Sequence, residues 1–217
     1  MANQAAIVAG IKRLAKSTFI YDLVLRSRAK RAIRDWHVAG FPVPPPNHFK
    51  EALVRRYGRK YGLRVFIETG TFYGNMVNAV RKDFAIIYSI ELDKGLYRRA
   101  REMFARYPHI AIIHGDSGII LERILAKIRE PCLFWLDAHY SGGVTAKGDA
   151  ETPITRELSH IFEHGVSRHV VLIDDARCFD GTNGYPTLDE VAAYVRDSRK
   201  PYRVNVEYDV VRIEPLS

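Results

Sequence analysis

The sequence contains few of the features that mark disulfide-rich, secreted or membrane-spanning proteins. Only two of its 217 residues are cysteines. A disulfide framework is therefore excluded, and a cytoplasmic location is the default expectation. No apolar run reaches the roughly 18 residues that a membrane span needs. We also expect no secretory signal, because the short apolar stretch 5–11 precedes the positive charges of Lys12, Arg13 and Lys16 instead of following them.

The residues that are present have the proportions of a globular protein, with 47% hydrophobic and 27% charged side chains. The net charge of +8 is unevenly distributed along the chain. Residues 1–64 hold 14 Lys and Arg against three acids, whereas the rest of the chain holds 19 against 22. A basic front of this kind binds phosphates, an anionic membrane surface or an acidic partner, or else forms a solvated helix face. The charge pattern leaves these alternatives open.

The first part of the chain is expected to be helical and to end in a stiff linker. Prolines occupy four of the six positions 41–46, where they prevent a helix. We therefore expect a basic helical extension over 1–46 and a separate domain over 47–217. The extension is expected to cover an active site or to form a homodimer contact. The individual helices are predicted over 4–16, 18–36 and 48–61.

The second part of the chain alternates short apolar runs with helical stretches. The runs are nearly continuous, which is typical of strands buried on both faces of a parallel sheet. Alternation with helices predicts an α/β fold with a doubly wound, Rossmann-like sheet of seven strands. Residues 202–213 leave no room for a helix between their two strands, so the last hairpin is expected to be antiparallel. The other strands are predicted over 64–68, 85–90, 109–113, 132–136 and 169–173. The helices between them are predicted over 74–83, 94–106, 117–129, 151–165 and 187–198.

Ligands of open α/β sheets bind beyond the carboxyl ends of the strands, so the residues that follow each strand are candidates. The first strand is followed by the loop Glu68, Thr69, Gly70, Thr71, Phe72, Tyr73, Gly74. Gly70 lets the chain turn and lets a ligand approach the backbone. The acid at the strand end would repel a pyrophosphate and favours a ligand that bears a positive group or free hydroxyls. A purely structural turn is the alternative.

Acids also follow the next two predicted strands. Glu91 lies about twenty residues after the glycine loop, where an acid accepts hydrogen bonds from both ribose hydroxyls. Asp116 and Ser117 follow the third strand and place an acid and a hydroxyl near a purine edge. Each acid is alternatively a helix cap at the surface. Three acids at successive strand ends favour a nucleoside site.

Taken in order, these motifs resemble those of the class I S-adenosylmethionine-dependent methyltransferases. The resemblance extends over about 150 residues, from Val65 to the C-terminus. It implies that the glycine loop binds the methionine part of the cofactor, that Glu91 binds the ribose, and that Asp116 lies beside the adenine. The cofactor-binding residues that it implies are Glu68, Thr69, Gly70, Thr71, Gly74, Glu91, Asp116 and Ser117.

Three further acids follow the fourth and fifth strands. Asp137 ends the fourth, and Asp174 and Asp175 end the fifth. These strand ends can lie side by side, and mutual repulsion would raise the pKa values of an unpaired group of carboxylates. A hard divalent cation such as Mg²⁺ would relieve that repulsion, because it prefers oxygen ligands. Asp174 is alternatively only a cap of the strand end.

This arrangement resembles the metal-dependent O-methyltransferases of the catechol and macrolide-sugar kinds, in which acids after the same two strands hold Mg²⁺. The resemblance implies metal ligands at Asp137, Asp174 and Asp175. Where the catechol enzymes usually carry a lysine close after the first acid, this chain has His139. We therefore predict that Asp137 and His139 are catalytic, and that His139 removes the proton of an acceptor hydroxyl. Alternatively, His139 binds only the backbone.

The sequence thus predicts methyl transfer to a hydroxyl of a sugar, a glycan or another small molecule. Two alternatives use the basic front. One is a module that binds RNA or an anionic membrane, and the other is a methyltransferase that acts on RNA or at a membrane. Few aromatic residues lie among the basic ones, which disfavours stacking on single strands of nucleic acid.

Overall fold

The computed structural model describes residues 27–137 and 152–216. The chain divides into two compact units, residues 1–50 and 51–217. In the first unit, residues 27–38 are helical, and the expected linker over 41–46 contains no helix. Trp36 is buried, and its indole N–H donates to the carbonyl of Pro42 at 2.7 Å. The helix expected over 4–16 lies outside the described residues. The domain boundary after residue 46 stays a prediction.

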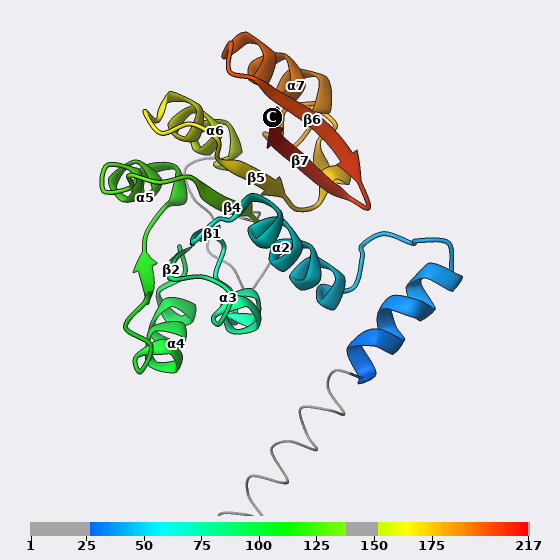
Figure 1. Ribbon diagram of the computed structural model, residues 1–217, viewed down its shortest axis with the longest axis vertical. Coiled ribbons are helices and arrows are strands. Elements are labelled where there is room, and N and C mark those ends of the chain that lie inside the picture. Colours follow the sequence, from blue (N-terminus) through cyan, green and yellow to red (C-terminus); the bar gives the residue numbers. More distant parts are fainter. Residues whose placement is uncertain (1–26, 138–151, 217) are drawn as a thin grey trace, which may run out of the picture. The chain divides into compact units, whose positions relative to one another are not determined.

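The second unit contains a seven-stranded sheet in the order β3-β2-β1-β4-β5-β7-β6 (Figure 1). Neighbouring strands from β3 to β5 are parallel, and β7 is antiparallel to both β5 and β6. This confirms the predicted α/β class and the antiparallel last hairpin. The strands are β1 Val65–Thr69, β2 Ile86–Glu91, β3 Ile110–His114, β4 Cys132–Leu136, β5 Val170–Ile173, β6 Tyr202–Glu207 and β7 Val210–Pro215.

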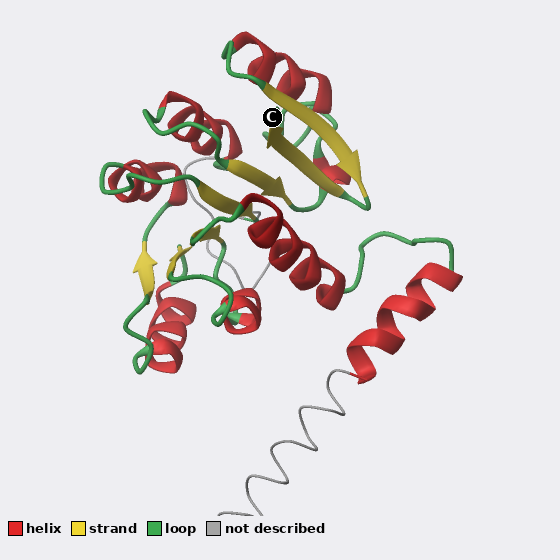
Figure 2. Ribbon diagram, in the orientation of Figure 1, coloured by secondary structure: helices red, strands yellow, loops and turns green. Residues whose placement is uncertain are grey.

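Helices cover both faces of this sheet (Figure 2). On one face, α5, α6 and α7 pack against alternate residues of the central strands in one continuous apolar core. On the other face, α2 buries Tyr57 and contacts α3 through the Arg55 guanidinium, which donates to the Ala79 carbonyl, while α4 lies beyond α3 (Figure 1). The helices are α2 Asn47–Tyr61, α3 Asn75–Val80, α4 Lys94–Phe104, α5 Ser117–Leu125, α6 Ile154–Glu163 and α7 Leu188–Asp197, with a short 3₁₀ helix, η1, at Ala176–Cys178.

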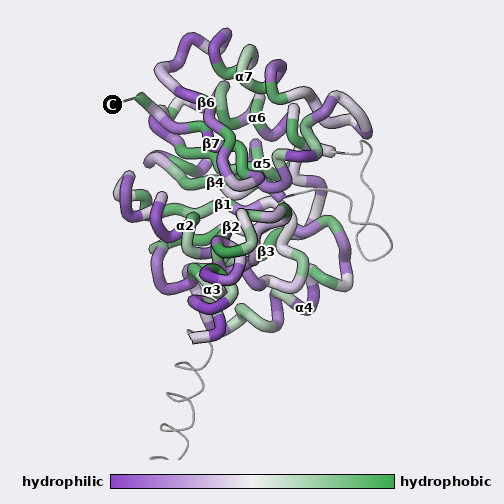
Figure 3. Tube along the Cα trace, turned by 90° about the vertical axis from the view of Figure 1, so that its right-hand side faces the viewer, coloured by the Kyte–Doolittle hydropathy of each residue, from purple (hydrophilic) through white to green (hydrophobic). Residues whose placement is uncertain are grey.

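The central strands are buried on both faces because their sequences are apolar at nearly every position. All five residues of β1 and all five of β4 are buried. Figure 3 shows the same concentration of hydrophobic residues along the middle of the sheet. Parallel strands covered by helices on both sides have this composition, and for that reason the apolar runs predicted their positions. None of the helices in the described ranges combines the length and the apolar character that crossing a bilayer requires.

A cluster of ion pairs around one buried carboxylate ties α2 to the last strand. The carboxylate of Glu214 on β7 accepts hydrogen bonds from the Lys60 ammonium at 2.7 Å and from the Tyr61 hydroxyl at 2.6 Å. Arg203 on β6 lies 3.3 Å from the other carboxylate oxygen. Although burial opposes the shift, these donors lower the pKa of Glu214 to about 2. The carboxylate therefore stays ionised at any ordinary pH and fixes α2 against this edge of the sheet.

Candidate active site

The carboxyl ends of β1, β4 and β5 lie side by side, as the sequence predicted. Thr69 of β1 pairs with Leu136 of β4, and Leu136 pairs with Ile173 of β5. The next residues continue this alignment, because the Asp137 amide donates to the Thr69 carbonyl and the Asp174 amide to the Leu136 carbonyl, each at 3.0 Å. The acids after β4 and β5 therefore begin from neighbouring positions at one edge of the sheet.

The loop after β1 is a tight turn that uses both of its glycines. The amides of Gly70 and Thr71 donate to the Ile90 carbonyl of β2 at 2.9 and 3.1 Å. Gly70 and Gly74 have φ angles of 90° and 75°, which favour glycine. A Cβ atom on Gly74 would lie 2.8 Å from the ring of Phe104. Gly74 thus serves close packing, while Gly70 allows the turn at the end of β1.

Glu68 is a buried acid beside this loop, with a side chain only 2% exposed. The hydroxyl of Ser89 on β2 donates to its carboxyl group and shares a second hydrogen bond, of 2.6 Å, with the Thr71 hydroxyl. Burial raises the pKa of Glu68 to about 8, and the charges of Asp137 and Glu91 add to the rise. Glu68 is therefore mostly protonated at neutral pH until a positive group comes near it.

Glu91, the last residue of β2, is oriented by two backbone amides. Its Oε1 accepts from the Asp93 amide at 2.8 Å, and its Oε2 accepts from the Phe72 amide at 2.7 Å. Phe72 adopts a φ of 49°, uncommon for a residue with a side chain, in making this contact. Burial raises the pKa of Glu91, whereas the two amides lower it. Because a carboxylate has about four acceptor positions, two are left for a diol.

Asp116 caps the first turn of α5 and also forms an ion pair. Its Oδ1 accepts from the Gly118 amide at 2.8 Å, and its Oδ2 lies 3.0 Å from a guanidinium nitrogen of Arg156 on α6. The cap that the sequence allowed as an alternative is thus present, which does not prevent the carboxylate from accepting a further bond. Ser117 is buried beside it. Arg156 was not among the residues that the sequence singled out.

Glu157 on α6 is a second residue that sequence reasoning missed. It is 1% exposed, and burial raises its pKa to about 7 against the effect of the Ser117 and Thr69 hydroxyls nearby. Among the described residues, its Oε1 has no hydrogen-bond partner. The signal was present in the sequence, because Ile154, Glu157, Leu158 and Ile161 have the i, i+3, i+4, i+7 spacing of one helix face. That spacing places Glu157 among core residues.

The predicted metal ligands at the ends of β4 and β5 have different environments. Asp174 is buried and its Oδ1 accepts from the Asp175 amide at 2.9 Å. The carboxylate of Asp175 is held by the Arg177 guanidinium at 2.8 Å, and Arg177 also binds Asp209 in the turn between β6 and β7. No group of three or more His, Cys, Asp or Glu side chains suited to a metal ion is found in 27–137 and 152–216. The three-carboxylate metal site stays a prediction.

A tyrosine that the sequence did not single out lies near these acids. Tyr185, in the loop that precedes α7, packs edge-on against Phe179 at 5.3 Å between ring centroids. Burial raises the pKa of its hydroxyl, and the charges of Asp175 and Asp137 contribute to the rise. The predicted catalytic His139 lies outside the described residues. Tyr185 thus places a phenolic hydroxyl near Asp137 and Asp175.

Comparisons with known proteins bear on the fold. No family model matches the sequence, and no curated protein matches it. Among solved structures, a methyltransferase from Podospora anserina with bound S-adenosylhomocysteine has a TM-score of 0.57 and 17% identity, covering 86% of this chain and 88% of that one. An O-methyltransferase from Bacillus cereus, also with S-adenosylhomocysteine, has a TM-score of 0.57 and 14% identity over 88% and 91% of the two chains. This chain has the class I methyltransferase fold. The methyltransferase fold that the sequence motifs implied is therefore confirmed.

A third structure of the methyltransferase fold agrees with the first two. It is the O-methyltransferase TomG from Streptomyces achromogenes, in complex with S-adenosylmethionine, with a TM-score of 0.53 and 15% identity over 88% of each chain. In an open α/β sheet of this kind the ligand crevice lies at the carboxyl ends of the strands, where the chain reverses its order between β1 and β4. Glu68, Glu91 and Asp137 all stand at that edge.

The buried acid Glu68 should make the stability of this methyltransferase-fold protein depend on pH in a particular direction. The native pKa of about 8 lies above the value of 4.5 expected for the unfolded chain, so the native state binds more protons between these values. The contribution of Glu68 to the free energy of unfolding is therefore fully present below pH 4.5 and is lost as the pH rises through 8. We expect Glu68→Gln to exceed the wild type in free energy of unfolding by about 4–5 kcal/mol at pH 8.5 and by about 2 kcal/mol at pH 6.

Urea unfolding of the ligand-free protein at pH 6, 7 and 8.5 measures this difference. The exposed Glu122→Gln on α5 is the matched control, and its curve should run parallel to that of the wild type. Parallel curves for Glu68→Gln and wild type would show that Glu68 titrates normally in the folded protein.

Proposed function

We propose that the protein is an S-adenosylmethionine-dependent O-methyltransferase that acts on a hydroxyl group of a sugar or another small molecule. The observation that carries the proposal is the row of acids at the carboxyl ends of neighbouring strands, with Glu91 fixed by two backbone amides in a methyltransferase fold. The O-methyltransferases among the similar structures support the choice of oxygen as the methyl acceptor.

The cofactor would lie across the ends of β1, β2 and β3. Its methionine part would occupy the turn at Gly70, where the buried carboxyl of Glu68 suits a positive group. Its ribose hydroxyls would donate to the two remaining acceptor positions of Glu91. Its adenine would lie beside Asp116 and Ser117 at the start of α5. In this placement, the two backbone amides that bind Glu91 would hold its carboxylate in position for the ribose.

The acceptor would approach from the ends of β4 and β5. His139 follows Asp137 by two residues, and its neutral imidazole would take the proton of the acceptor hydroxyl. The resulting oxygen would attack the sulfonium methyl group in line, with positioning supplying much of the rate. Tyr185 and Arg177 would form the wall on the side of the acceptor, where a hydroxyl and a half-exposed guanidinium face a polar substrate.

We propose metal assistance with two carboxylate ligands instead of the three predicted from the sequence. Mg²⁺ is commonly held by one or two carboxylates together with water and substrate oxygens. Asp137 and Asp174, on adjacent strand ends, fit such a pair, whereas the Asp175 carboxylate is already engaged by Arg177. A metal there would lower the pKa of the acceptor hydroxyl. We therefore assign Asp175 the task of positioning Arg177.

Cofactor binding is the first test of the proposed function. Titration calorimetry with S-adenosylhomocysteine should give saturable binding to the wild type at one site. Glu91→Ala should weaken this binding about 100-fold, because two charge-assisted hydrogen bonds are lost at about 1.5 kcal/mol each. Glu102→Ala, an exposed acid on α4, should bind like the wild type. Absence of binding to the wild type at millimolar ligand would refute the function.

Metal dependence needs a separate test on methyl transfer. The protein is incubated with labelled S-adenosylmethionine and a panel of sugars, phenols and RNA, with Mg²⁺ or with a chelator. We expect the chelator to lower transfer at least tenfold and Asp174→Asn to lower it similarly, because both remove the stabilisation of the acceptor oxyanion. Equal transfer with chelator and in Asp174→Asn would rule out the metal, and labelling of RNA instead of small molecules would favour the nucleic-acid alternative.

A further inference from the structure

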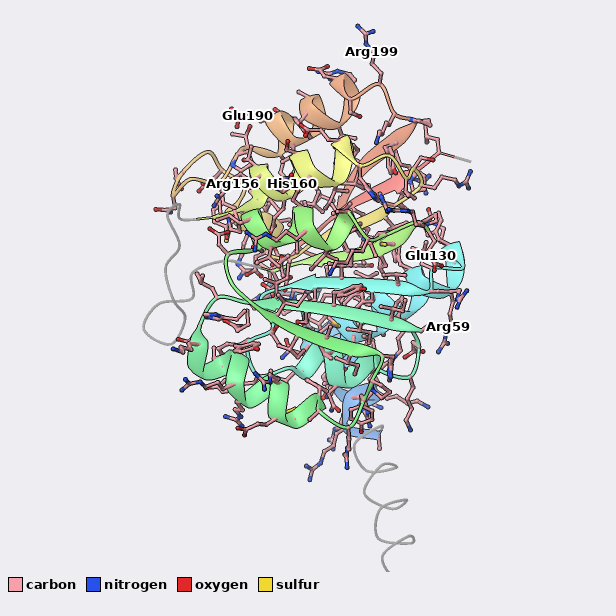
Figure 4. All side chains as sticks on the ribbon, turned by 90° about the vertical axis from the view of Figure 1, so that its left-hand side faces the viewer. Arg59, Glu130, Arg156, His160, Glu190 and Arg199 are labelled. Carbon is pink, nitrogen blue, oxygen red and sulfur yellow. The ribbon has the colours of Figure 1, made fainter. Side chains whose placement is uncertain are left out.

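The first two turns of α6 are pinned to the first turn of α5 by several polar contacts. Arg156 pairs with Asp116 at 3.0 Å, and the His160 ring nitrogen Nε2 lies 2.9 Å from the Gly118 carbonyl. Figure 4 labels Arg156 and His160 on this helix. Asp116 begins the segment that the sequence assigned to the adenine end of the cofactor. Residues of α6 therefore border that segment, although they come from a part of the chain some forty residues later.

The position of the Arg156 guanidinium depends on a glycine. A Cβ atom built on Gly118 would lie 2.7 Å from Nε and 2.9 Å from Cζ of Arg156, so any larger residue would displace the guanidinium. The planar group thus lies against the backbone of α5 with Asp116 fixing one of its nitrogens. A helix N-terminus does not attract a cation, so the space at Gly118 and the charge of Asp116 must hold it there. The Arg156 side chain remains 42% exposed.

Glu157, the neighbour of Arg156, points from α6 toward the start of α5 and the end of β1. Its fully buried carboxyl faces the hydroxyls of Ser117 and Thr69, and its Oε1 has no partner among the described residues. Thr69 is the last residue of β1, directly before the glycine loop. A buried polar atom without a partner is costly, and proteins retain such atoms where a ligand or water completes the site. The wall between β1, α5 and α6 therefore has the character of an incomplete polar site.

We propose that Arg156 binds the cofactor through the face of its adenine ring, while Asp116 binds the edge of the same ring. A guanidinium plane stacks well on a nucleobase, and a lysine ammonium does not reproduce that contact. Gly118 is then required as the space in which the guanidinium lies flat. The inference rests on the proposed function, because it assigns a new residue to the adenine end of that cofactor site.

Calorimetric titration with S-adenosylhomocysteine tests the inference on the full-length protein. Arg156→Ala should weaken binding about tenfold, which is the usual size of one base-stacking contact. Arg156→Lys should restore less than half of the loss on a logarithmic scale, because it keeps the charge and lacks the plane. Gly118→Ala should weaken binding to a similar degree by displacing the guanidinium.

Two control variants separate a stacking contact from a loosened helix. His160→Ala removes the other contact of α6 with Gly118 and should leave the affinity within twofold of the wild type. Arg123→Ala removes an exposed cation of α5 and should also leave it unchanged. Wild-type affinity in Arg156→Ala would overturn the inference, and so would full rescue by Arg156→Lys. Failure of the wild type to bind would instead overturn the proposed function itself, so the two failures are distinguishable.

Discussion

The burial of several carboxyl groups at one edge of the sheet is the constraint on which the rest of this structure depends. Glu68 is nearly inaccessible to solvent, and it lies close enough to Asp137 and Glu91 for their charges to raise its pKa further. Burial of unpaired carboxylates is expensive. The ligand-free protein meets the cost by keeping Glu68 protonated and by surrounding Glu91 with backbone donors. A positively charged ligand at this edge would be stabilised by the same groups.

The sheet must therefore hold these acids close together when no ligand is bound. Every residue of β1 and β4 is buried, and the hydrogen bonds between strands continue one residue beyond their ends, to Asp137 and Asp174. Far along the chain, the ion pairs of Glu214 fix α2 to the last strand. There a carboxylate is paired and has a lowered pKa, whereas Glu68 and Glu91 at the strand ends have raised pKa values. The contrast separates a structural acid from candidates for ligand binding.

The sequence predicted the sheet and the acids at its edge but not the contacts of helix side chains. Continuous apolar runs located the strands to within about a residue, since burial on both faces makes most positions inside a central strand apolar. The position of Asp137 at a strand end follows from this. Arg156 and Tyr185 were missed because their partners come from helices and loops whose relative rotation no periodicity specifies, whereas Glu157 was missed although the helical spacing of α6 places it among core residues.

The number of protons released when S-adenosylmethionine binds tests directly whether Glu68 receives the positive charge of the cofactor. Calorimetry at pH 7.5 in buffers of different ionisation enthalpy gives this number. We expect net release on binding of the sulfonium cofactor, because its positive charge lowers the pKa of Glu68 from about 8. We expect less release with the uncharged sulfur of S-adenosylhomocysteine. Binding of S-adenosylmethionine with no proton release would contradict the claim that a buried, protonated acid at the strand ends receives the charge of the cofactor.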